Sequence, residues 1–132
     1  MSKTLTIMLC SGYQENEDPI FTVGLAKAVL KAGYGLNIFL FDNAVNMANK
    51  EKPIEGHVHI TDRLREHMDI GKVGDELEEI AKMGGQIATC HTNEYGRGTE
   101  ADDYRPGIEW GDVGQSFTAF LIKTDVLITV AH

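Results

Sequence analysis

The chain has 132 residues, with 20 acidic and 12 basic side chains, and therefore a formal charge of −8. This length is typical of one domain, and 42% hydrophobic residues with 24% charged residues is typical of a folded chain. The acidic balance argues against direct nucleic-acid binding, which requires an excess of Lys and Arg. No apolar run reaches the roughly 18 residues that span a bilayer, and no secretory leader is recognisable. We therefore expect one cytoplasmic domain over residues 1–132, with no membrane partner.

Alternating strand and helix patterns follow one another from the start of the chain. The nearly continuous apolar run Leu5–Cys10 predicts a strand that is buried on both faces. Asp18 as N-cap and Pro19 as first helical residue then introduce a helix that ends at Gly33. The strand Leu36–Phe41 completes a βαβ unit, whose parallel strands require a crossover helix.

The same alternation continues through the second half of the chain. In order, we expect a helix that ends at Gly84, the strand Gln86–Cys90, a helix capped by Asp112 and the strand Val126–Val130. This alternation predicts a three-layer α/β/α fold with a mostly parallel, flavodoxin-like or Rossmann-like sheet of about five strands.

Two connections exceed the roughly 12–15 residues of an ordinary loop, namely Asp42 to Gly71 and His91 to Gly111. Apolar spacing indicates two short helices in the first connection, one at Val45, Met47 and Ala48 and another at Leu64, His67 and Met68. Both connections leave the carboxyl ends of strands, the edge at which open α/β sheets place their sites. We therefore expect the functional site at this edge.

The two cysteines, Cys10 and Cys90, are too few for a disulfide framework or for a cysteine-only zinc or iron–sulfur site. Cys90 ends a central strand, and a helix that begins directly after it would favour the reactive thiolate, with Arg97 adding positive charge. The alternative is a buried and inert strand cysteine. His91 would pair with Cys90 only if the chain turned there. For Cys10, a place in the core is favoured over a role as resolving thiol.

The remaining motifs give little support for a metal site or a nucleotide-binding site. His57 and His59 have the spacing of a metal pair on a strand, but no third ligand is near in sequence. The segment Ser11-Gly12-Tyr13 matches neither glycine-rich nucleotide-binding pattern. Four carboxylates are better explained as a solvated acidic loop and a helix cap than as a metal site: Asp102, Asp103, Glu109 and Asp112. We expect no metal and no cofactor.

Taken in order, these features resemble the DsrE/TusD family of small sulfur-trafficking proteins. The resemblance is carried by the opening strand with Ser11-Gly12, the strand Ile38–Phe41, the strand that follows Gly84-Gly85 and ends in Cys90, the Gly96-Arg97-Gly98 segment, and the closing helix and strand of Gln115 to Val130. Cys90 falls where active members carry their sulfur-accepting cysteine. Only this residue role is transferred from the family.

The resemblance implies a sulfurtransferase, or sulfur carrier, that accepts sulfur as a persulfide on Cys90 and passes it to a partner cysteine in sulfur oxidation or a sulfur relay. It implies no cofactor, and a homotrimer, homohexamer or hetero-oligomer with related subunits. The alternatives are a non-catalytic subunit and a redox sensor that links Cys10 to Cys90. The sequence departs from the family pattern over Lys50 to Met68 and Asp102 to Trp110, which are candidates for lids or oligomer contacts.

Overall fold

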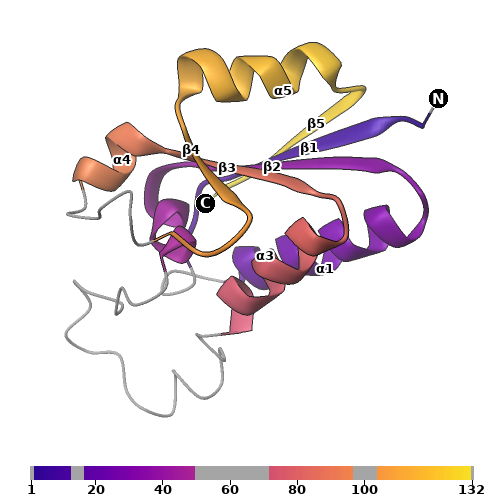
Figure 1. Ribbon diagram of the computed structural model, residues 1–132, viewed down its shortest axis with the longest axis horizontal. Helices are drawn as coiled ribbons and strands as arrows, with labels where there is room; N and C mark the ends of the chain where they lie inside the picture. The colour runs from indigo at the N-terminus through magenta and orange to yellow at the C-terminus, as the bar shows by residue number, and fades with distance from the viewer. Residues whose placement is uncertain (1, 13–16, 50–71, 97–103, 132) are drawn as a thin grey trace.

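The computed structural model describes residues 2–12, 17–49, 72–96 and 104–131. Within these ranges, five parallel strands form one sheet in the order β4-β3-β2-β1-β5. The strands are β1 (Thr4–Leu9), β2 (Gly35–Leu40), β3 (Gln86–Cys90), β4 (Ile108–Gly111) and β5 (Val126–Val130). This arrangement confirms the predicted α/β class with a parallel sheet (Figure 1).

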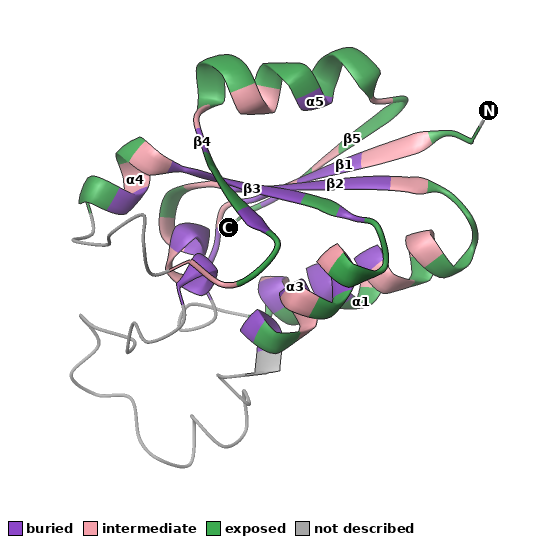
Figure 2. Cartoon of the chain, in the orientation of Figure 1, coloured by how far each residue is buried: buried purple, intermediate pink, exposed green. Residues whose placement is uncertain are grey.

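Helices cover both faces of the sheet, but unequally. Helices α1 (Asp18–Lys31) and α3 (Lys72–Lys82) lie together below the sheet in Figure 1. The other face is covered by a π-helical turn, η3 (Val113–Phe117), that continues directly into the short helix α5 (Thr118–Lys123). Figure 2 shows that β5 and much of α5 remain exposed, whereas β2 and β3 are largely buried.

Two apolar clusters fill the space on either side of the sheet. Because successive side chains of a strand point to opposite faces, Ile38 and Leu40 pack with α1 and α3, while Phe39 packs on the opposite side with Phe120. Complete burial of a side chain of this size contributes about 1.5–3 kcal/mol. The central strand β2 therefore holds both layers together.

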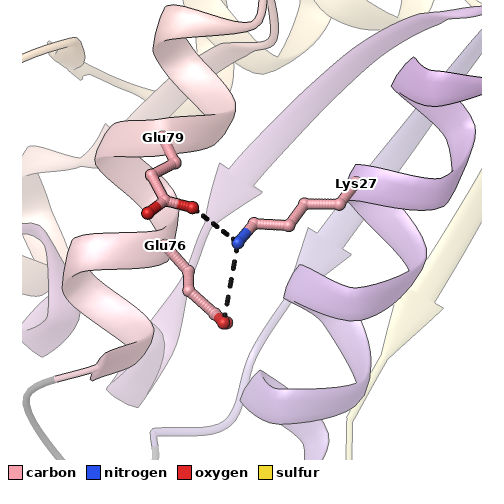
Figure 3. Close-up of polar contacts among 3 residues, drawn as sticks. All are labelled: Lys27, Glu76 and Glu79. Carbon is pink, nitrogen blue, oxygen red and sulfur yellow. Dashed lines mark hydrogen bonds and ion pairs between the residues drawn. The ribbon is translucent and has the colours of Figure 1, made fainter.

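An ion-pair cluster joins the two helices of the first face. Lys27 of α1 reaches across to α3, with its Nζ 2.7 Å from Glu79 Oε2 and 3.6 Å from Glu76 Oε1 (Figure 3). Glu79 is well exposed, so solvent screens this interaction. We therefore expect these ion pairs to add little to the free energy of unfolding and to act mainly on the relative orientation of α1 and α3.

The helix ends agree with the sequence pattern except at the start of α1. Gly33 and Gly84 have φ angles of +89° and +103°, as expected for residues that end helices. Asp112 accepts a hydrogen bond from the Gln115 backbone N–H and so caps η3, as predicted. The prediction that Asp18 is the N-cap of α1 was wrong by one residue, since Asp18 is already helical and accepts a hydrogen bond from Ser11 Oγ at 3.2 Å.

The long connections contain more structure than their sequence indicates. A 3-10 helix, η1 (Asp42–Ala48), confirms the first predicted short helix, whereas the second lies outside the described residues. The fifth strand, β4, lies inside the segment expected to be a connection. It has four residues and, within the described sheet, pairs only with β3, so it is too short to show a period of two in the sequence.

In the part of the chain that the structure describes, we find no helix that is both long and apolar enough to cross a bilayer.

Candidate functional site

The candidate site lies at the carboxyl edge of the sheet, where β2 and β3 end. Helix α4 (His91–Gly96) begins at the residue that follows Cys90, so the chain turns sharply after the strand. From the sequence, a helix directly after Cys90 was only a condition for a reactive thiolate, and the structure contains one. On the next strand, Phe41 separates β2 from η1, and the Asp42 backbone N–H donates a hydrogen bond of 2.7 Å to Asn93 Oδ1 of α4. The two short helices are thereby joined at this edge (Figure 1).

Cys90 is buried, with 3% of its surface exposed. It belongs to the apolar cluster on the α5 side of the sheet, with Phe39 and Val45 among the buried members and Phe117 among the partly buried ones. The rings of Phe39 and Phe117 stack at a centroid distance of 5.0 Å. The sequence left open whether Cys90 is a reactive, accessible thiol or a buried strand cysteine. In the isolated chain it is buried.

A glycine allows this cover to approach the strands closely. Gly111 of β4 is the register partner of Cys90, and a Cβ at this position would collide with the side chain of Ser116. Ser116 Oγ accepts a hydrogen bond of 3.2 Å from the Asp112 backbone N–H. The absence of a side chain at Gly111 thus lets η3 pack against the sheet beside Cys90.

His91 has partners other than the neighbouring thiol. Its Nδ1 lies 2.7 Å from the Gly111 carbonyl oxygen, and because a carbonyl only accepts, Nδ1 carries the proton. In the neutral ring, Nε2 then has the free lone pair. The imidazole stacks on Trp110 at a centroid distance of 4.3 Å, and Tyr95 meets the imidazole and the indole edge-on at 6.0 and 6.4 Å. We call these three residues the aromatic patch.

Glu94 is the unexpected residue of the site. It lies four residues beyond Cys90 in α4, and only 1% of its surface is exposed. Neither of its carboxylate oxygens has a hydrogen-bond partner within the described structure. Burial raises the pKa of Glu94 to about 8, because the charged form loses its hydration without gaining a partner.

Cys10 lies at the same edge but in a different electrostatic setting. It is partly buried, and its backbone N–H continues the pairing of β1 with β5 by donating to the Val130 carbonyl at 2.9 Å. Desolvation, and secondarily the negative charge of Asp42, raise the pKa of the Cys10 thiol above its ordinary value. This environment disfavours the thiolate and hence nucleophilic attack by Cys10.

The remaining sequence candidates do not assemble into a second centre. Among the described residues, no group of three or more His, Cys, Asp or Glu side chains is placed to hold a metal ion. His57, His59 and Arg97 lie outside the described residues, as do Asp102 and Asp103. Glu109 is exposed on β4.

A cavity of about 520 Å³ opens on the same face of the sheet as Cys90 but at its opposite end. It is lined by residues that begin strands, such as Thr4, Gly35 and Gln86, and by Lys123 at the end of α5. Cys90 does not line it. We therefore do not assign this cavity to the candidate site.

Sequence reasoning missed two features of this edge. The burial of Glu94 is not visible in the sequence, because α4 is too short for a helical period to separate inside from outside. For the aromatic patch, one signal was present, since His91 and Tyr95 are four residues apart and share a face of any helix. Trp110 comes from a strand that the sequence did not predict.

No protein-family model matches the chain, and no curated protein sequence matches it either. Solved structures do match it over nearly its whole length. The ychN protein from E. coli is 22% identical, with a TM-score of 0.71 over 98% of this chain and 99% of that one. The protein of unknown function MTH1491 from Methanobacterium thermoautotrophicum is 10% identical, with a TM-score of 0.65 over 98% of this chain and 99% of that chain.

A third match is BT1422 from Bacteroides thetaiotaomicron, a conserved protein of unknown function, at 19% identity and a TM-score of 0.65 over 97% and 95% of the two chains. At these identities the likeness shows the fold alone. The chain therefore shares a complete α/β fold with proteins from bacteria and from a methanogen, and its chemistry has to be argued from its own residues.

Proposed function

We propose that this chain is a sulfur carrier, or sulfurtransferase, that accepts sulfur as a persulfide on Cys90 and delivers it to a cysteine of a partner protein. The observation that carries the proposal is the position of Cys90. It is the last residue of an inner strand, at the carboxyl edge of a parallel sheet, where α/β folds place their reactive groups. The resemblance to the DsrE/TusD family, which rests on an ordered set of features over most of the chain and places Cys90 where active members carry their sulfur-accepting cysteine, supplies the reaction.

The reaction needs no cofactor and is balanced in electrons. The Cys90 thiolate attacks the outer sulfur of a donor persulfide, R–S–SH, so that a new S–S bond forms on Cys90 while the donor bond breaks. The electron pair of the broken bond leaves on the donor sulfur as R–S⁻. Delivery is the same exchange in reverse, with the partner thiolate attacking the outer sulfur of Cys90–S–SH. We place this chemistry in a reducing cytoplasm, where thiols remain free.

Mass spectrometry of the intact protein tests this proposal. Incubation with a polysulfide is expected to add steps of about 32 Da, one sulfur atom each, to the wild-type chain. Cys90→Ser should abolish the addition, and Cys10→Ser, as the matched control, should retain it. A wild-type chain that stays unmodified with several donors, or a Cys90→Ser variant that still gains sulfur, would contradict the assignment.

A second candidate is a non-catalytic subunit of a hetero-oligomer. The burial of Cys90 favours this candidate, because sulfur exchange requires the thiol to be reached. The same experiment separates the two functions, since a non-catalytic subunit would not take up sulfur at Cys90.

The register of the sheet argues against the third candidate, a Cys10–Cys90 redox sensor. Leu9 pairs with Leu40 and Leu40 pairs with Thr89, so Cys10 and Cys90 follow at the same level with β2 between them. Two strand spacings separate their Cα atoms by about 10 Å. A disulfide tolerates at most about 7 Å. The bond would therefore require displacement of a strand.

For assembly, we propose a homotrimer or homohexamer, or a hetero-oligomer with related subunits. Supporting this, the edge strand β5 and the adjoining helix α5 expose large apolar side chains, with Ile122 of α5 at 78% and Val126 of β5 at 53%. An apolar edge strand without charged residues or proline invites pairing with another chain. This surface lies at the opposite edge of the sheet from β4.

A further inference from the structure

The aromatic patch is a surface feature that the sulfur chemistry does not use. Its members come from two elements that flank Cys90. His91 and Tyr95 belong to α4, which begins directly after Cys90, and Trp110 precedes Gly111, the register partner of Cys90 on β4. The rings stack on one another yet stay open to solvent, with Tyr95 exposed by 58% and Trp110 by 46%. Exposed and stacked aromatic residues are the type that anchors protein contacts.

The geometry fixes the patch before any partner arrives. The hydrogen bond from His91 Nδ1 to the Gly111 carbonyl ties the first ring to the edge strand, and the stacking distance of 4.3 Å to Trp110 holds the second against it. Rings that are already held lose little side-chain entropy when a partner binds. In the described sheet β4 pairs only with β3, so no described strand lies along its outer edge.

The charge around the patch indicates what occupies it. Among the described side chains, four exposed lysines lie at the amino edge of the sheet, before β1 or at the last turns of the three main helices: Lys3, Lys31, Lys82 and Lys123. Arg105 is held by Asp75 at 2.9 Å and by Glu78 at 3.5 Å. These four lysines are therefore distant from the patch, and Arg105 is already paired.

Among the described side chains, carboxylates predominate at the carboxyl edge instead. Asp18 opens α1, Asp42 opens η1 and Asp112 caps η3, all at the edge where the strands end. Asp112 also lies two residues beyond Trp110 along the chain. Aromatic faces attract cations, Arg above all, and carboxylates at the same edge of the sheet strengthen the attraction at low salt.

We propose that the aromatic patch docks a basic segment of a partner protein, with Arg or Lys side chains stacked on Tyr95 and Trp110. The role of that partner, as donor or acceptor of sulfur, rests on the proposed function. The docking surface rests only on the patch and its charge. A partner bound here lies beside the strand end that carries Cys90.

The chain contains one tryptophan, so its fluorescence reports on the patch directly. The test is a titration of the full chain, in the Cys90→Ser background, with synthetic peptides of equal length that are rich in Arg, neutral, or rich in Glu. We expect the Arg-rich peptide to change Trp110 emission saturably and to bind at least about tenfold more tightly than the Glu-rich one at low ionic strength. High salt should reduce this preference.

Tyr95→Ala removes a ring from the patch without disturbing the core, because Tyr95 is exposed. We expect it to weaken binding of the Arg-rich peptide about two- to fivefold. Tyr34→Ala, another exposed tyrosine but between α1 and β2, is the matched control and should leave binding unchanged. Equal weakening by both variants, equal affinity for the three peptides, or tighter binding of a single-stranded oligonucleotide would each overturn the proposal. No sulfur is transferred in this titration, so its outcome is independent of persulfide formation on Cys90.

Discussion

Glu94 is buried in α4, four residues beyond the proposed reactive cysteine, and its carboxylate has no hydrogen-bond partner in the described structure. Its burial affects the stability of the fold, and the variant Glu94→Gln tests this effect. Burial raises the pKa of Glu94 from the ordinary 4.5 to about 8 in the folded chain. Between these two values, the folded state holds a proton that the unfolded state has released. The free energy of unfolding therefore falls as pH rises from about 4.5, and it levels off above about pH 8.

The size of the effect follows from the two pKa values. Proton linkage gives a loss of about 2.5 kcal/mol between about pH 5 and about pH 7, and about 1 kcal/mol more by about pH 8. Gln has nearly the same shape as Glu but does not ionise, so Glu94→Gln is expected to lack this loss and to exceed the wild type in stability near pH 8.

Urea unfolding at a series of pH values, followed by the emission of Trp110, measures this difference. Glu109→Gln is the matched control, because Glu109 is exposed and the variant keeps Glu94. It should reproduce the wild-type decline. If Glu94→Gln declines with pH as steeply as the wild type, the buried carboxyl is not protonated in the folded chain and the reasoning fails.

Two further predictions concern the cover of Cys90 and the exposed edge at β5. Val45→Ala removes part of the apolar cover at a cost of about 1 kcal/mol, so we expect iodoacetamide to alkylate Cys90 about fivefold faster. Val23→Ala, in the cluster on the other face, should leave the rate unchanged, and equal acceleration would mean that global unfolding exposes the thiol. Sedimentation should give a trimeric or larger mass for the wild type and a smaller one for Ile122→Glu, with Phe21→Glu on α1 as control. A monomeric wild type would refute the assembly.

The strands with continuous apolar runs could be predicted from the sequence. Leu5–Cys10 and Leu36–Phe41 are found within one residue of their expected ends because burial on both faces leaves few polar residues inside them. β4 could not be predicted, because only Ile108 and Gly111 of its four residues are buried, and they point to opposite faces of the sheet. One buried residue on each face does not make a pattern.

In the candidate site, too, some features could be predicted from the sequence and others could not. The position of Cys90 at the end of a strand follows from local sequence and is found, whereas the helix directly after it was only a condition in the sequence argument. Its exposure was not predictable, because its cover comes from Val45, Phe117 and Phe120, which are distant in sequence. The same holds for Trp110, which meets His91 only through the pairing of β3 with β4.

The unequal covering of the two sheet faces reconciles a buried Cys90 with a reactive one. The face away from Cys90 carries helices of 14 and 11 residues, whereas the face that holds it carries a helix of 6 residues and a π-helical turn. Short segments with few buried contacts open locally at a lower free energy than core strands do. We infer that Cys90 reacts through such openings. A partner docked on the aromatic patch would bind next to the segment that opens, which is η3 with α5. In the absence of a partner, the cover would also protect the Cys90 thiol from small oxidants.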